Sequence, residues 1–359
     1  MLLTECGIDL ALQGGGSHGA FTWGVLDRFL ADPGIRIGGL SGTSAGAMNA
    51  VVLASGFAKA GRQGAREALN EFWETISRIG SRSAFQHTPF DALFKPWIPG
   101  GSTMFKIFDL MSRLVSPYQL NPWNFNPLRD LVAKHVDFEL LRNCEDPKLF
   151  VSATNIRTGH HRVFRNRDIS LDAVLASACL PMLFHAVKIG GEAYWDGGYA
   201  ANPALLPLIA ESAPRDLVLV QINPIERPRI PHTAHDIIDR INEISFNSSL
   251  NQELRTVALI KRLLKEEEAS GHSYDAHLFA KIDALNVHRV EAQKELCRFG
   301  AASKLSPERN FINRLHDIGY QAADAWLAQN RTALGQRSTI ELLDDYAEDL
   351  TQNTKEPNQ

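Results

Sequence analysis

The sequence has little of several features that mark whole classes of protein. Only four of its 359 residues are cysteines, and no two of them form a Cys-x-x-Cys pair. This scarcity argues against a disulfide framework and against a cysteine-based zinc site, so it favours a reducing compartment. No apolar run approaches the about 20 residues that a membrane-spanning helix needs. A secreted cysteine-rich module and an integral membrane protein are therefore both disfavoured.

Clustered positive charge is also missing. The formal net charge is −4, and Lys and Arg nowhere form the dense run that is typical of a nucleic-acid-binding surface. The start of the chain, MLLTECGIDLAL, lacks the basic region of a secretory signal peptide and leads directly into an apolar strand. We therefore expect a cytoplasmic protein without a nucleic-acid partner, whose contact with a membrane would be peripheral, at the inner face.

The composition and patterning that are present indicate a globular α/β protein. Hydrophobic residues make up 44% of the chain and charged residues 22%, which are ordinary values for a folded domain. Residues 8–13 predict a buried strand, a helix follows over about 18–31, and the short strand 35–40 leads into a helix of small residues. Two such strand–loop–helix units in succession predict parallel strands with right-handed crossovers.

The alternation breaks off between residues 81 and 127, where aromatic residues and methionines stand among turn residues. We expect this aromatic-rich insertion to pack on the core, to form part of an interface, or to act as a lid that faces a membrane. Strands and helices return from residue 148 and end with the apolar strand DLVLVQIN at 216–223.

Beyond residue 225 the pattern becomes helical. Apolar residues recur at helical spacing from 237 to 264, and a further helix is predicted over 308–329. These helices could cover the sheet or build a homo-oligomer. We therefore expect three parts: an α/β domain over 1–225 that includes the insertion at 81–127, a helical C-terminal extension over 226–350, and a disordered polar tail over 351–359.

A glycine-rich loop, LQGGGSHG at 12–19, follows the first predicted strand. Its spacing Gly14-x-Gly16-x-x-Gly19 fits a dinucleotide-binding loop. It fits an oxyanion hole equally well, because both uses need unhindered backbone amides at the positive end of a helix. The loop alone leaves the two uses open.

The second motif, GTSAG at 42–46, decides between them. It is the G-x-S-x-G of a nucleophile elbow, and it stands between a predicted strand and a predicted helix, as that motif requires. A dinucleotide site would instead need an acidic residue at the end of this second strand, but the nearest one, Asp32, precedes the strand. We therefore interpret the glycine loop as an oxyanion hole, with its amides facing a carbonyl that Ser44 attacks.

A serine hydroxyl needs a base to take its proton. The chain has twelve histidines, but none of the six from His232 to His316 stands in an obvious strand-end loop. Asp196, in YWDGGYA, is the alternative; Asp followed by two glycines is first of all a turn signal. The residues by themselves do not decide which group activates Ser44.

Taken together and in this order, LQGGGSHG, GTSAG and DGG resemble the patatin-like phospholipase family. The resemblance covers about residues 8–225 and includes SATNIRTG at 152–159 and SACLP at 177–181. It implies an α/β fold, a three-layer α/β/α sandwich with a mostly parallel central sheet, here followed by C-terminal helices. It also implies a lipid acyl hydrolase of the phospholipase A type that works without a cofactor or a metal ion.

The resemblance assigns roles to individual residues. Ser44 would be the nucleophile and Asp196 the base of a Ser–Asp dyad that has no histidine, and the reaction would pass through an acyl-enzyme. The remaining family positions are the oxyanion-hole residues Gly14, Gly15 and Gly16 and the supporting glycines Gly19, Gly42, Gly46, Gly197 and Gly198. His18 departs from the pattern, because many members carry Arg or Lys there; we expect it to be a residue of the helix N-terminus.

Other functions remain open at this stage. A general carboxylesterase or thioesterase on soluble acyl esters would use the same serine chemistry. A catalytically inert binding protein could have kept the fold, although the intact Ser44 and Asp196 count against it. A nucleotide-binding oxidoreductase is disfavoured, because the acidic residue that would bind the ribose is missing.

Overall fold

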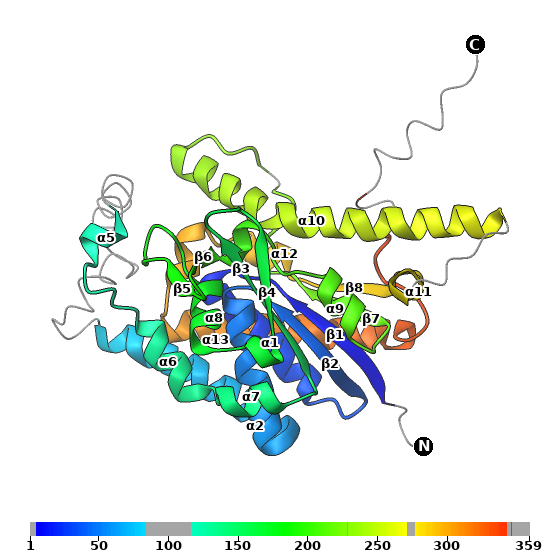
Figure 1. Cartoon of the computed structure of the whole chain (residues 1–359), viewed down its shortest axis with the longest axis horizontal. Helices are drawn as coiled ribbons and strands as arrows, with labels where there is room; N and C mark the ends of the chain where they lie inside the picture. Colours follow the sequence, from blue (N-terminus) through cyan, green and yellow to red (C-terminus); the bar gives the residue numbers. More distant parts are fainter. Residues whose placement is uncertain (1–4, 84–115, 228, 271–276, 343–345, 347–359) are drawn as a thin grey trace, which may run out of the picture.

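The computed structural model describes residues 5–83, 116–227, 229–270, 277–342 and 346 of the chain (Figure 1). The predicted tail over 351–359 and most of the predicted aromatic-rich insertion, residues 84–115, lie outside these residues.

One eight-stranded sheet forms the centre of the molecule, with the strand order β5-β6-β3-β2-β1-β7-β8 and β4 paired to β3. The strands are β1 (Cys6–Leu12), β2 (Ile35–Gly42), β3 (Lys148–Asn155), β4 (His161–Arg165), β5 (Val187–Ile189), β6 (Glu192–Asp196), β7 (Asp216–Val220) and β8 (Asn286–Val290). The ladder from β3 through β2, β1 and β7 to β8 is parallel, whereas β4, β6 and β5 pair antiparallel. The predicted mostly parallel sheet is confirmed.

Helices cover both faces of this sheet (Figure 1). They are α1 (Gly19–Leu30), α2 (Ala45–Ser83, kinked at Ala60 and Gly61), α5 (Pro117–Leu120), α6 (Pro127–His135), α7 (Phe138–Asn143), α8 (Leu171–Ser177), α9 (Leu206–Glu211), α10 (Ala234–Ala269), α11 (His277–Asp283), α12 (Gln293–Leu296) and α13 (Arg309–Asn330). Short 3-10 turns are η1 (Gly16–His18), η3 (Asn166–Asp168), η4 (Gly197–Tyr199), η5 (Ala301–Leu305) and η6 (Arg331–Ala333).

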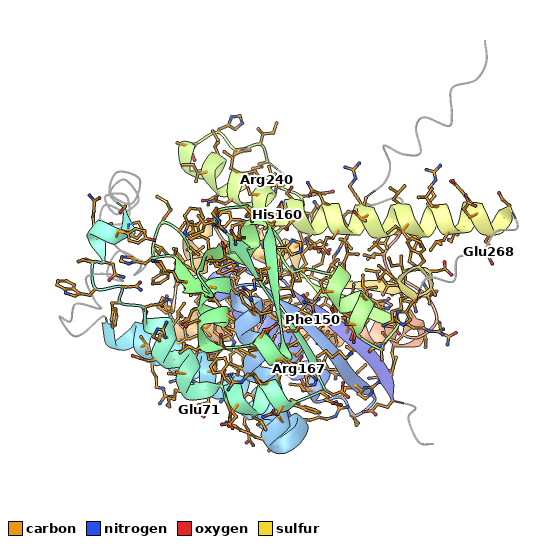
Figure 2. The ribbon with its side chains drawn as sticks, in the orientation of Figure 1. Glu71, Phe150, His160, Arg167, Arg240 and Glu268 are labelled. Atoms are coloured by element: carbon orange, nitrogen blue, oxygen red, sulfur yellow. The ribbon has the colours of Figure 1, made fainter. Side chains whose placement is uncertain are left out.

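Strands β1, β3 and β7 are apolar on both faces, and each contributes side chains to two cores, one on either side of the sheet. Leu10 and Leu12 of β1 lie in a core with α1, α2 and α13, and Ala11 between them lies in a second core with α9, α10 and α11. Phe150 of β3 belongs to the second core (Figure 2). The three predicted layers follow from this alternation of side chains along each strand.

The C-terminal extension is part of the same body as the α/β domain. Its α10 covers one face of the sheet and its α13 packs on α1 on the other face (Figure 1). It also supplies β8, which pairs with β7, whereas the sequence predicted only helices there. The sequence pattern does not predict this strand, NVHRV, because His288 interrupts its apolar run. The buried imidazole is paired with Asp216, with 2.9 Å between Nε2 and Oδ1.

Candidate active site

The glycine loop leaves β1 at the carboxyl edge of the sheet and is held by side chains from distant segments. The Gly14 amide donates to Asn202 Oδ1 at 2.7 Å, and the Gly14 carbonyl accepts from Asn223 Nδ2 at 3.0 Å. Gln13 Oε1 accepts from the amide of Asn223 at 2.8 Å, which ties the loop to the end of β7. The Gly14 amide is therefore engaged, which differs from the expectation that it faces a substrate.

The next two amides of the loop are differently placed. Within the described part of the chain, the structure gives no hydrogen-bond acceptor to the backbone N–H of Gly15 or of Gly16. Gly16 has a φ of +58°, and a Cβ there would lie 2.2 Å from the Lys304 carbonyl oxygen. Only glycine combines this left-handed backbone with so close an approach, so the loop requires glycine at this position.

The loop lies directly beside the nucleophile elbow. A Cβ added to Gly14 would stand 2.9 Å from the Cβ of Ser44, and one added to Gly46 would stand 2.1 Å from the carbonyl oxygen of Leu12. Gly19 similarly faces Ala45, with 2.6 Å from an added Cβ to the Ala45 Cβ. The glycines predicted to support the site therefore let two strand-to-helix turns touch.

Ser44 has the strained backbone that the elbow motif predicts. Its φ is +55°, one of two positive values among the described non-glycine residues, and it stands between the end of β2 and the start of α2. Gly42 makes the turn feasible, because an added Cβ would lie 2.5 Å from the Gly46 carbonyl oxygen. The Ser44 amide donates to Ser177 Oγ at 2.9 Å, and the residue is 9% exposed.

Asp196 ends β6 and is fully buried. Its Oδ1 accepts from the Gly198 amide at 2.8 Å, while its Oδ2 has no hydrogen-bond partner among the described residues. Burial raises the pKa of this carboxyl to about 7, although the Gly198 amide and the Ser44 hydroxyl both lower it. The structure thus brings Asp196 and Ser44 close enough to influence each other, with one carboxylate oxygen unengaged.

The two glycines after Asp196 begin η4, and neither has space for a side chain. A Cβ on Gly197 would lie 2.2 Å from the Ser152 carbonyl oxygen, and one on Gly198 would lie 2.4 Å from the ring of Phe246. The turn therefore presses against β3 on one side and α10 on the other, and this contact fixes the direction of the Asp196 carboxylate.

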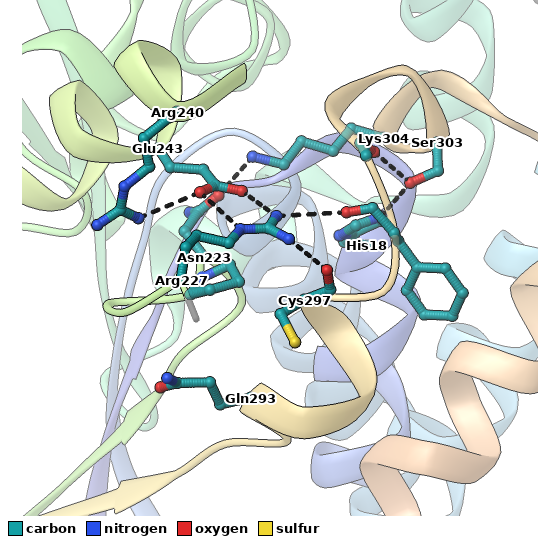
Figure 3. A network of polar contacts seen from close by, with 12 residues as sticks. His18, Asn223, Arg227, Arg240, Glu243, Gln293, Cys297, Ser303 and Lys304 are labelled. Atoms are coloured by element: carbon teal, nitrogen blue, oxygen red, sulfur yellow. Dashed lines mark hydrogen bonds and ion pairs between the residues drawn. The ribbon is translucent and has the colours of Figure 1, made fainter. Parts of the chain in front are cut away.

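His18 lies beside the loop but outside the pair. It is buried, and its Nε2 lies 2.8 Å from Ser303 Oγ (Figure 3). Burial, together with Lys304 and Arg227, lowers the pKa of His18 to about 3, so the ring is neutral at physiological pH. It is a packed residue of the α1 N-terminus, and it contributes no positive charge to the site.

Four residues that hold the site were missed by the sequence reasoning: Ser177, Asn202, Asn223 and Lys304. Ser177 falls in SACLP, which contributed to the resemblance without a role for its serine. Asn223 had a usable signal, because it is a polar residue just after a buried strand at the carboxyl edge of the sheet. Lys304 and Asn202 had none.

The described residues also bear on metal binding and on membrane crossing. Among them, no group of three or more His, Cys, Asp or Glu side chains is placed to hold a metal ion. Within the same residues, no helix combines the length and the apolar character needed to cross a membrane.

With this geometry in place, the chain was compared with known proteins. A family model described as "Patatin-like phospholipase" matches residues 10–209, which is more than half of the chain. The matched range contains all three motifs, LQGGGSHG, GTSAG and DGG, and with them Ser44 and Asp196. No curated protein matches the chain.

Proposed function

The chain belongs to the patatin-like phospholipase family, and we propose that it is a serine-dependent lipid acyl hydrolase of the phospholipase A type. Membership implies a hydrolase that acts on lipid substrates. The observation that carries the finer proposal is the pairing of Ser44, on its strained elbow, with a fully buried Asp196 whose pKa is raised to about 7. A carboxylate of that pKa is matched to proton transfer near neutral pH.

The first half of the proposed reaction forms an acyl-enzyme. Ser44 Oγ attacks the ester carbonyl carbon while its proton passes to Asp196, where the unengaged Oδ2 can receive it. The charge that develops on the carbonyl oxygen is stabilised by the amides of Gly15 and Gly16. Gly14, whose own amide is held by Asn202, orients these two donors rather than acting as a third.

Departure of the alcohol completes the acyl-enzyme, and the second half of the reaction, its hydrolysis, then releases the fatty acid. The proton on Asp196 goes to the leaving alcohol as the C–O bond of the ester breaks. A water molecule then attacks the acyl-enzyme, gives its proton to Asp196, and the carbon–Oγ bond breaks as that proton returns to Ser44. The products are one alcohol and one carboxylic acid, and both side chains end in their starting states.

We also propose a peripheral contact with a lipid surface. The outer face of α10 carries Ile237, Ile241 and Ile244, spaced so that they lie on one side of the helix, and all three are exposed. The same helix covers the Asp196 turn from its inner side with Phe246, whose ring lies 5.6 Å from that of Tyr199. A membrane touching this face would lie next to the proposed site and its substrate.

The test of the proposed chemistry is labelling by a fluorophosphonate, run in parallel with fatty-acid release from phospholipid vesicles. We expect wild type to be labelled on Ser44, Ser44→Ala to be unlabelled, and Asp196→Asn to release fatty acid at least about 100-fold more slowly. Labelling without release from vesicles would favour a carboxylesterase or thioesterase on soluble esters. A wild type that is neither labelled nor active would refute the enzyme and favour an inert binding protein.

A further inference from the structure

A segment of the C-terminal extension lies against the glycine loop. The carbonyl oxygen of Lys304, in η5, would be 2.2 Å from a Cβ on Gly16, so its backbone touches the loop directly. One residue earlier, Ser303 shares the hydrogen bond with His18 (Figure 3). Because the Ser303 hydroxyl donates its own hydrogen to the Gly300 carbonyl, His18 is the donor in that bond. The extension is therefore anchored at the N-terminus of α1.

From this anchored segment a lysine side chain reaches under the loop. Lys304 Nζ donates to Asn223 Oδ1 at 2.5 Å (Figure 3). Asn223 Nδ2 in turn donates to the Gly14 carbonyl at 3.0 Å. Asn223 is fully buried and Lys304 is partly buried. The ammonium group is thus two hydrogen bonds away from the peptide that joins Gly14 to Gly15.

That peptide carries one of the proposed oxyanion donors. In a planar trans peptide the C=O of one residue and the N–H of the next point in opposite directions. A hydrogen bond that pulls the Gly14 carbonyl toward Asn223 therefore aims the Gly15 N–H the other way. It also polarises the peptide, since hydrogen bonds in a chain strengthen one another and a charged donor strengthens them further.

Lys304 is the basic side chain that binds Asn223, whereas the nearby arginines bind Glu243. Glu243 is buried and is bound by Arg227 and by Arg240, the latter with 3.2 Å between Nη1 and Oε2. Burial lowers the pKa of Lys304, while Glu243 and Asp239 raise it and Arg227 lowers it. His18, where the family pattern often has a cation, is neutral.

We propose that Lys304 is a positioning residue for the oxyanion loop, which acts through Asn223 on the Gly14–Gly15 peptide. The inference rests on the proposed function and adds to it. The C-terminal extension, which lies outside the matched range of residues 10–209, completes the active site. A positive charge that the loop itself lacks comes from the opposite end of the chain.

The test uses the full chain and a short-chain nitrophenyl ester, with thermal unfolding as the check on folding. We expect Lys304→Met to lower kcat about 10- to 100-fold, somewhat less than the loss of a direct oxyanion donor, while KM changes by less than about twofold. The rate of fluorophosphonate labelling should fall in parallel. Lys304→Arg should recover part of kcat, and Lys294→Met, at an exposed lysine of the adjacent α12, should match wild type.

A second variant keeps the proposal open to refutation if Lys304→Met folds poorly. Asn223→Asp retains an acceptor for Lys304 but loses the Nδ2 donor to the Gly14 carbonyl, so kcat should fall similarly. Adding Lys304→Met to Asn223→Asp should lower kcat little further, because both changes break the same chain of hydrogen bonds from Lys304 through Asn223 to Gly14.

The outcomes separate this inference from the proposed function. Wild-type kcat in Lys304→Met, or fully additive losses in the double variant, would overturn the inference while leaving the enzyme intact. A wild type without Ser44-dependent hydrolysis would instead remove the proposed function, and the Ser44→Ala comparison detects that case independently.

Discussion

At the scale of single residues, the proposed site concentrates two unfavourable states. Ser44 holds a left-handed backbone, which costs a non-glycine residue about 1–2 kcal/mol. Asp196 is a carboxyl group removed from water, and burial penalises its charged form. Both lie among closely packed turns, where a Cβ on Gly42, Gly46 or Gly197 would stand within 2.5 Å of a backbone oxygen. Strain and desolvation placed together in this way are typical of functional sites.

The raised pKa of Asp196 predicts the pH profile of the reaction. The carboxyl must be ionised to accept the Ser44 proton, so kcat/KM should rise with pH, with a midpoint near 7, and level off above it. The measurement is kcat/KM for a soluble ester from pH 5 to 9. A profile that is already flat at pH 5 would show that the base has an ordinary carboxyl pKa.

The burial of Asp196 also lowers the stability of the protein at high pH, and unfolding measurements detect this effect separately from catalysis. A carboxyl whose pKa is raised on folding stabilises the protein at low pH, and that stability is lost as pH rises from the unfolded value through about 7. At pH 8 the free energy of unfolding of Asp196→Asn, measured by denaturant titration, should therefore exceed that of wild type by about 1 kcal/mol or more. Asp9, buried with a pKa also raised to about 7, titrates in both proteins and cancels in the comparison.

At the scale of elements, the contact between α1 and α13 binds the extension to the first core. The helices approach so closely that a Cβ on Gly319 would lie 2.0 Å from the Phe21 carbonyl oxygen, and one on Gly24 would lie 2.0 Å from the His316 carbonyl oxygen. Both glycines stand in helices, where they lower intrinsic helix stability. Close packing of two backbones explains why they are placed there.

This contact predicts that Gly319→Ala destabilises the protein although alanine is the better helix former. The added methyl group collides with backbone rather than with a flexible side chain, so we expect a loss of about 1–3 kcal/mol in the free energy of unfolding. Gln321→Ala, at an exposed position of the same helix, should stay within about 0.5 kcal/mol of wild type. A Gly319→Ala variant as stable as this control would refute close packing as the reason for the glycine.

At the scale of the whole molecule, the extension and the α/β domain form one structure. The extension supplies the edge strand β8 and covers one face of the sheet with α10 and the other with α13. It also brings Lys304 to the glycine loop. The boundary near residue 225 is a change in the sequence pattern, and as a domain boundary it stays a prediction. One consequence is that α10 has an inner face toward the site and an outer face of exposed isoleucines.

The outer face of α10 can be tested by vesicle binding. Ile241→Glu should weaken sedimentation with phospholipid vesicles about tenfold or more, because burial of one such side chain contributes about 1.5–3 kcal/mol. Leu263→Glu is a matched control, since Leu263 is similarly exposed on the distant part of the same helix. Unchanged binding would exclude this face as the lipid contact. A changed oligomeric state, measured by light scattering, would show instead that it joins copies of the chain.

The local parts of the site were predictable from the sequence because they are made by short stretches of backbone. The GTSAG elbow, the glycine loop and the DGG turn each require small residues at fixed spacing, so the requirement is visible in the letters themselves. The parallel sheet followed in the same way from strand–loop–helix order. Strand β8 was missed because a buried His288 needs a partner, Asp216, that lies far away in the sequence.

The sequence by itself therefore determined the three glycine-containing motifs, the order of the strands through β7 and the membership of a family. Only the tertiary structure decided which amides of the glycine loop donate a hydrogen bond and which have no acceptor among the described residues. In the sequence, Asn202 and Lys304 carry no signal of a role at the site, and Asn223 stands out only as the polar residue at the end of an apolar strand. They act on Gly14 only because folding brings three separate segments to one edge of the sheet, where each polar group must find a partner.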